Sequence, residues 1–488
     1  MRPLAPIGRR ACRFAGRRTV YRVEPVGPHT AGGTSPATGP IGLDAADPFP
    51  TIGPMAQPID LIRAIDPGEL DRAIERHTEA AFRYLEDLVR APSVVGSEQA
   101  ALEVFAAEME DLGFAIERLP IAGDIGEVPG SGVPSRSYEG RYDVVARRAG
   151  EPSLASLLLN GHIDVVPADE PHLWTSPPFE PTRRDGWLFG RGAGDMKCGF
   201  AMGALALRAL RDVSPPDAVG PLSFLAAIEE ECTGNGTLSA TRAGVRADGV
   251  VLLEPTNLDL LLGGVGILWV EIAVEGRAAH AEAAAGAVNA IEAALPLFRA
   301  LEALEDELNE TKDPRIRAPR PFAVNAGRIR GGDWPSSVPS VVRIDVRIGF
   351  PIGWTPDQAE GRLRAHIAVA AAADPWLAIH PPTVSQIGFR AEGYDLPADA
   401  PLARALAAAH RDAHGSEPGS VVLASTTDAR VYLNRQGIPA VCYGPRTERI
   451  HGIDEAVELA TIVAGARTLA RFIATWSRKA AVGPPDDR

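Results

Sequence analysis

Three short apolar runs in this sequence each end at residues that can hold a metal ion. One run ends at His162, with Asp164 two positions later; another ends at three successive glutamates, residues 229–231; a third ends at Glu254. Short apolar runs bounded by Gly and Pro are typical of buried strands in a parallel sheet. Because ligands bind outside the carboxyl ends of such strands, the spacing predicts one metal-holding crevice and therefore an enzyme.

His162 and Asp164 have the spacing of a metal ligand and a residue that supports it. On an extended chain, side chains two apart point to the same side, so Asp164 can reach His162. A histidine that binds a metal usually donates its other ring N–H to a carboxylate, and Asp164 fits that role. The alternative is that both residues are simply solvated at a strand end.

Further candidates lie in loops. Asp195 belongs to a glycine-rich segment, residues 190–197, where it could cap a helix or bridge two cations about 3.5–4 Å apart. Within the glutamate triplet, one residue could bind metal while its neighbour takes a proton from water. Glu254 and His451 could equally be a surface glutamate and a structural histidine when each is considered alone.

Composition excludes several classes of protein. The chain has 488 residues and a net charge of −14, which argues against nucleic acid or an anionic membrane as partner. No stretch reaches the roughly 18 apolar residues that span a bilayer. The four cysteines form no CxxC pair, so we expect a reducing cytoplasm, with Cys198 and Cys232 as buried packing residues rather than ligands.

The first 54 residues differ from the rest of the chain. Residues 1–22 contain seven arginines and no acidic residue, as in a transit peptide. Because no helical apolar periodicity accompanies them, we favour a disordered tail over residues 1–54, or an upstream start codon with Met55 as the working start.

The elements that must position these residues fall into two patterns. Strands and helices alternate up to residue 265 and again after residue 382, which predicts an α/β catalytic domain with a mixed, mainly parallel sheet, built from 55–265 and 383–488. Residues 266–382 alternate apolar and polar positions and predict a small inserted α+β domain. Helices are expected over residues 69–90, 100–112, 196–210, 288–308, 358–371, 402–413 and 455–477.

Together these segments resemble the M20 metallopeptidase and amidohydrolase family, and within it the deacylases of acetylornithine and succinyl-diaminopimelate. The similarity runs from about residue 68 to 472 and includes five motifs in order, at 161–167, 190–197, 229–237, 253–256 and His451. This resemblance implies a zinc-hydrolase fold with an inserted lid and dimerisation domain.

The resemblance also implies a role for each candidate residue. Asp195 would bridge two zinc ions per chain, for which cobalt can substitute; His162 and Glu254 would complete one site, and Glu231 and His451 the other. Glu230 would be the general base, with Asp164 supporting His162. In the alternative register of the triplet, Glu229 is the base and Glu230 the ligand.

The inserted domain carries further positions of the family pattern. By the resemblance, His280 reaches the active site of a partner subunit and stabilises the oxyanion, so a homodimer is expected through the lid. Arg347 matches a lid arginine, and Arg430 a loop arginine that binds a substrate carboxylate. Two residues depart from the pattern: Ser336 stands where many members have Asn, and Cys198 replaces a usual Gly.

The sequence thus predicts a zinc-dependent hydrolase that removes an N-acyl group from an amino acid or related amine. Its substrate would be a small molecule, an N-acyl amino acid or short peptide. A carboxypeptidase or dipeptidase of the same family is the alternative, and a non-catalytic binding protein on this scaffold is a more remote one.

Overall fold

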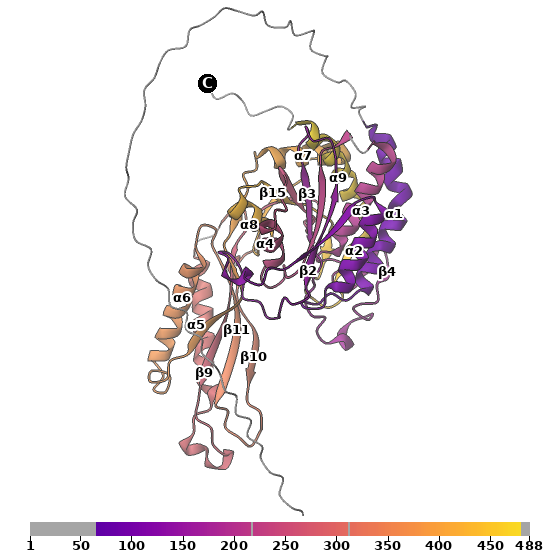
Figure 1. Cartoon of the computed structure of the whole chain (residues 1–488). Coiled ribbons are helices and arrows are strands. Elements are labelled where there is room, and N and C mark those ends of the chain that lie inside the picture. The colour runs from indigo at the N-terminus through magenta and orange to yellow at the C-terminus, as the bar shows by residue number, and fades with distance from the viewer. Residues whose placement is uncertain (1–64, 216–217, 311–312, 480–488) are drawn as a thin grey trace, which may run out of the picture. The chain divides into compact units, whose positions relative to one another are not determined.

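The computed structural model describes residues 65–215, 218–310 and 313–479 (Figure 1). The N-terminal segment, for which we expected a disordered tail or a start at Met55, lies outside the described residues, as does Cys12. The described helices include none that is long and apolar enough to cross a membrane. Cys198, Cys232 and Cys442 are buried free thiols.

The central sheet has nine strands in the order β1-β2-β6-β3-β7-β15-β8-β13, with β14 paired to β8. Its middle strands β6, β3, β7 and β15 run parallel, whereas β1, β2 and β13 pair antiparallel. This confirms the predicted mixed sheet. The strands are β1 (Ala115–Pro120), β2 (Tyr142–Arg148), β3 (Leu157–His162), β6 (Leu222–Ala227), β7 (Gly249–Leu252), β8 (Leu260–Gly264), β13 (Tyr394–Asp395), β14 (Ser420–Leu423) and β15 (Ala440–Cys442).

Helices cover both faces of this sheet, which explains its continuous apolar strands. In β3, Leu157 and Leu159 pack into one core while Leu158 packs into another on the opposite face. Figure 1 shows α1, α2 and α3 on one side of β3 and α4 and α8 on the other. The helices are α1 (Pro67–Arg90), α2 (Gln99–Asp111), α3 (Lys197–Val213), α4 (Asn235–Arg242), α7 (Pro401–His414), α8 (Ala429–Val431) and α9 (Leu459–Lys479).

A second, antiparallel sheet forms the inserted part, in the order β10-β11-β9-β12. Its strands are β9 (Gly266–Glu275), β10 (Val324–Gly331), β11 (Val341–Phe350) and β12 (Thr383–Ala391), and helices α5 (Ala290–Leu308) and α6 (Pro356–Ala372) share its core. The predicted α+β architecture is confirmed. Strand β12, however, lies beyond residue 382, where we expected the catalytic domain to resume; a bulge between Gln386 and Arg390 interrupts its alternation.

A third, small sheet joins segments that are distant in sequence. It pairs β16 (Thr447–Glu448), β17 (Ala456–Glu458), β5 (Trp187–Phe189) and β4 (Thr182–Arg184) in that order. Residues 167–191 therefore contain two of its strands, and the last helix begins at Leu459, four residues later than expected. Because β17 pairs with β5, the segment after His451 lies beside the segment before Asp195.

Candidate metal centre

The three strand ends do meet at one edge of the central sheet. Strands β6, β3 and β7 are parallel neighbours, with His162 opposite Ala227 and Asn160 opposite Leu252. The residues that follow β6 and β7, the glutamate triplet and Glu254, therefore emerge beside His162. This confirms the spatial part of the prediction from the three apolar runs.

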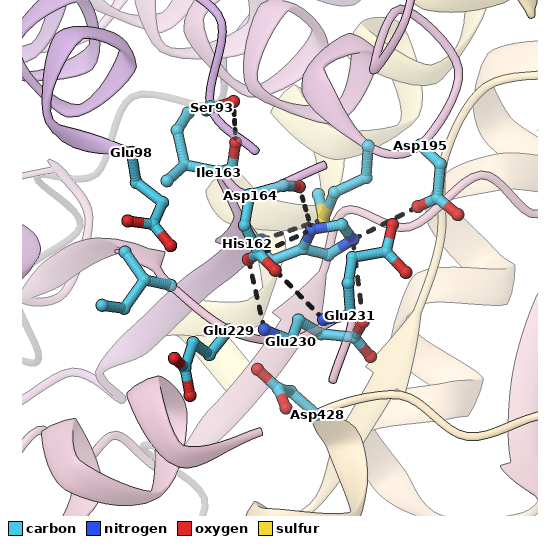
Figure 2. A network of polar contacts seen from close by, with 12 residues as sticks. Ser93, Glu98, His162, Ile163, Asp164, Asp195, Glu229, Glu230, Glu231 and Asp428 are labelled. Atoms are coloured by element: carbon cyan, nitrogen blue, oxygen red, sulfur yellow. Dashed lines mark hydrogen bonds and ion pairs between the residues drawn. The ribbon is translucent and has the colours of Figure 1, made fainter. Parts of the chain in front are cut away.

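Asp195 lies between the two histidines, with one carboxylate oxygen toward each (Figure 2 shows the His162 side). Its Oδ1 is 3.2 Å from His162 Nε2 and its Oδ2 is 3.4 Å from His451 Nε2. Glu254 Oε2 is 3.9 Å from His162 Nε2, and Glu231 Oε2 is 3.0 Å from His451 Nε2. Donor atoms of one tetrahedral ion with bonds of about 2.1 Å are about 3.4 Å apart, so these contacts fit a metal site.

A compact group of three can be singled out. The ligand atoms of His162, Asp195 and Glu231 all lie within 4.8 Å of one another. They combine one imidazole with two carboxylates, the donor types that zinc and similar divalent ions accept.

The electrostatics of the group show an excess of negative charge. Burial raises the pKa of Glu254 to about 8, and the charge of Asp195 adds to this rise. Burial likewise raises the pKa of Glu230 well above its usual range. For Asp195 burial acts in the same direction, but contacts with His162 and His451 outweigh it and lower the pKa. A bound cation would neutralise the negative charge of carboxylates crowded in this way.

The three glutamates of the triplet point in different directions. Glu229 is directed away from His162 (Figure 2) and accepts hydrogen bonds from Arg141 Nη1 and Tyr138 Oη, both at 2.5 Å. The carboxylate of Glu230 faces the cavity, with Oε2 at 4.0 Å from His162 Nε2, while that of Glu231 contacts His451. Glu229 has a positive φ of 63°, a conformation that turns the chain between the first two glutamates.

Asp164 supports the site differently from our expectation. His162 Nδ1 lies 2.9 Å from the backbone carbonyl oxygen of Asp164 and 3.7 Å from its carboxylate, so the ring N–H donates to the carbonyl. The Asp164 carboxylate instead accepts the backbone N–H groups of Glu230 and Glu231, each at 3.1 Å. It therefore fixes the glutamate triplet relative to β3.

With this geometry in place, comparison with known proteins decides the family. A model of peptidase family M20/M25/M40 matches residues 158–475, well over half of the chain. The chain belongs to this family.

Two relatives of this M20 chain, each about 30% identical, are named as deacylases. The N-formyl-4-amino-5-aminomethyl-2-methylpyrimidine deformylase of Halalkalibacterium halodurans is 30% identical over 363 residues, 70% of this chain and 84% of the relative. The succinyl-diaminopimelate desuccinylase of Methylobacterium radiotolerans is 31% identical over 400 residues, 79% of this chain and 93% of the relative.

Among solved structures, the M20 chain shares its fold with the dipeptidase Dug1p from Saccharomyces cerevisiae. The TM-score is 0.71 at 14% sequence identity, and the match covers 85% of this chain and 99% of that chain.

Sequence reasoning missed the residues that hold the Asp195 loop of this M20 protein. The carboxylate of Glu455 accepts the backbone N–H groups of Gly194 at 2.8 Å and Asp195 at 2.9 Å, and it is paired with Arg191. Glu455 and Arg191 are both almost fully buried. The available signal, an arginine in the glycine-rich segment and an acid after His451, was too weak to connect positions 264 apart.

A cavity of about 990 Å³ opens at the metal centre. Arg347 lines it together with His162, Asp195, Glu230, Glu231, Glu254 and His451.

Two other predicted site residues lie elsewhere. His280 is exposed and outside the lining of its own chain's cavity. Arg430 is buried, and its guanidinium donates to the carbonyl oxygens of Thr233 and Gly130 at 2.8 and 3.2 Å. In this structure Arg430 therefore braces the loop after the glutamate triplet, and its contact with a substrate carboxylate stays a prediction.

Proposed function

We propose that this M20 protein is a zinc-dependent amidohydrolase that removes an N-acyl group from an amino acid or related amine. The observation that carries the proposal is the position of Asp195, whose two oxygens each face a different histidine. Two zinc ions per chain, or cobalt in their place, would share Asp195. His162 and Glu254 would hold one ion, and Glu231 and His451 the other.

Glu230 is the general base in this proposal. Two bound cations would supply electrophilic activation of a water molecule and of the amide carbonyl. Glu230 takes the proton of the attacking water and returns it to the leaving amine. Burial, which raises the pKa of Glu230, suits a group that must both accept and release a proton. Asp164 holds the backbone of Glu230 in position, and Glu229 is engaged with Arg141.

The choice of a deacylase over a peptidase rests on sequence similarity. Relatives near 30% identity are named as a deformylase and a desuccinylase, whereas the likeness to a dipeptidase is one of fold. A carboxypeptidase or dipeptidase is thus the second candidate.

We also keep the cytoplasm as the expected compartment, since the described cysteines are free thiols.

Metal analysis combined with a substrate panel tests the proposal. We expect close to two zinc ions per chain, and faster hydrolysis of N-formyl, N-acetyl or N-succinyl amines than of dipeptides. Faster cleavage of dipeptides would replace the deacylase by the peptidase. Full folding without metal and without turnover of any amide would favour the non-catalytic binding protein.

We also propose a homodimer through the inserted domain. Exposed apolar side chains lie along α5 and β10 and in the loop after β10; this edge patch consists of Ile291, Leu295, Ile329 and Trp334. Strand β10 lies at the edge of its sheet, and none of the described strands pairs with its outer side. The backbone N–H and C=O groups on that side are available to a strand of another subunit. A partner bound here would bring a second His280 to the assembly. In each chain, His280 lies outside the lining of that chain's own cavity and is therefore available to the cavity of the other chain.

Disrupting the edge patch is expected to lower both the oligomeric state and the activity. Leu295→Asp places a charge in the patch and should yield monomers by light scattering. Its kcat should fall about 10²- to 10³-fold, the usual effect of losing one oxyanion donor. Val369→Asp on α6 is the control, because Val369 is also highly exposed, at 74%, but outside the patch. A fully active monomer would contradict a role for the partner's His280.

A further inference from the structure

The two histidines of the metal centre are held in different ways. The ring of His162 is buried, and its Nδ1 donates to the backbone carbonyl oxygen of Asp164. The side chain of His451 is 51% exposed, and its Nε2 contacts Glu231 and Asp195. None of the described residues forms a hydrogen bond with His451 Nδ1. Because this ring lacks the backbone support that His162 has, its position depends on the loop that carries it.

The loop of residues 449–454, here called the His451 loop, has an unfavourable backbone. Arg449, His451 and Asp454 have φ angles of 56°, 62° and 55°, in the left-handed region that residues other than glycine seldom adopt. His and Asp tolerate this region better than most residues do, but for all three it is less stable than the right-handed one. Such a conformation persists only where the surrounding structure imposes it. Contacts from outside the loop must therefore hold it.

One such contact joins Asp454 to Thr175, which is 279 residues away in the sequence. Asp454 Oδ1 accepts the backbone N–H of Thr175 at 2.8 Å, and Asp454 Oδ2 accepts its hydroxyl at 2.7 Å. The hydroxyl bond is the main cause that lowers the pKa of Asp454, so the acceptor is a carboxylate at neutral pH. Hydrogen bonds to an ionised acceptor are stronger than neutral ones, and two of them fix the direction of the carboxylate as well as its distance.

Thr175 is itself anchored through its neighbour Trp174. Trp174 is only 8% exposed, and the guanidinium of Arg191 lies 5.2 Å from the centroid of its ring. A cation over the face of an indole is an attractive contact. Arg191 is almost fully buried and is paired with Glu455. Thr175 therefore offers its hydroxyl from a fixed position rather than from a free surface loop.

We propose that Thr175 is a positioning residue of the metal centre, which acts through Asp454 to hold the His451 loop. With the loop held, His451 Nε2 stays at the position where it can share a metal ion. This inference rests on the proposed function and deepens it, because it assigns two residues outside the cavity lining to one of the two ions. The ion at His162 should not depend on Thr175, since the ring of His162 has its own backbone partner.

Zinc binding to the metal-free full chain tests this role. Titration in competition with a chromogenic chelator resolves the affinities for the two ions. Thr175→Val removes the hydroxyl but keeps the shape of the side chain, and we expect it to weaken the binding of one ion by about tenfold, the lower end for a residue that supports a metal ligand. The affinity for the other ion and the urea midpoint of the metal-free chain should not change. Thr175→Ser, which keeps the hydroxyl, should bind both ions as tightly as the natural chain.

Thr182→Val is the matched control, because the hydroxyl of Thr182 belongs to the same part of the chain but donates to the carbonyl oxygen of Glu180. Asp454→Gly is a second probe, since glycine adopts a positive φ freely and the variant loses both hydrogen bonds without added strain. Adding Thr175→Val to Asp454→Gly should cause no further loss, because the hydroxyl then has no acceptor.

Two results would overturn the positioning role alone: additive losses in the double variant, or natural affinity for both ions in Thr175→Val. A natural chain that binds fewer than two zinc ions would contradict the proposed metal centre, and this inference with it.

Discussion

Glu230→Gln is expected to lower kcat by about 10³-fold or more, toward the upper end of what general acid–base catalysis contributes. The amide side chain has the size of the carboxylate but cannot take a proton from water. The backbone N–H of residue 230 still reaches Asp164, and Glu230 is not among the proposed metal ligands, so folding and zinc content should remain. Steady-state kinetics on the best N-acyl substrate, with zinc measured on the same sample, provides the check.

Glu229→Gln is the matched control for this prediction. The same chemical change one residue earlier lies on a side chain engaged with Arg141 and Tyr138. Arg141 keeps its second partner Glu98, at 2.5 Å, so the variant should fold and retain most of its kcat. If Glu229→Gln is inactive while Glu230→Gln loses zinc, the alternative register holds, with Glu229 as base and Glu230 as ligand.

The metal-centre candidates could be predicted because the relevant information is local in the sequence. An apolar run and the polar residue that ends it are adjacent, and parallel strands bring such ends to one edge. His162 and Glu254 are of this kind. Asp195 and His451 lie in loops, where the family resemblance, rather than periodicity, indicated them. Their approach depends on the pairing of β17 with β5, two three-residue strands with too little sequence signal to detect.

The supporting contacts could not be predicted because they join residues far apart in the chain. Arg430 has a type and loop position compatible with a substrate contact. In the fold its guanidinium reaches Gly130 and Thr233, which are 300 and 197 residues away. The ring partner of His162 was mispredicted for a different reason. Sequence spacing places a whole residue beside the ring but does not distinguish its carboxylate from its backbone carbonyl.

Glu455→Ala is expected to have the largest effect on stability, because it leaves Arg191 as a buried cation without its partner. The guanidinium of Arg191 and the carboxylate of Glu455 are 3% and 1% exposed. Removing one member of a buried ion pair costs about 3–5 kcal/mol, a large part of the net stability of a typical domain. Urea unfolding followed by circular dichroism measures the loss. The zinc affinity should fall as well, because the N–H groups of Gly194 and Asp195 lose their acceptor.

A double variant separates these two effects. In Arg191→Met combined with Glu455→Leu, apolar side chains replace the whole pair, and such replacements are often neutral for stability. The double variant should therefore regain most of the unfolding free energy lost in Glu455→Ala. Zinc binding should stay weak, since neither new side chain can accept from the backbone of Asp195. A double variant that binds zinc as tightly as the natural chain would show that Glu455 contributes to folding alone and does not position the residue between the two histidines.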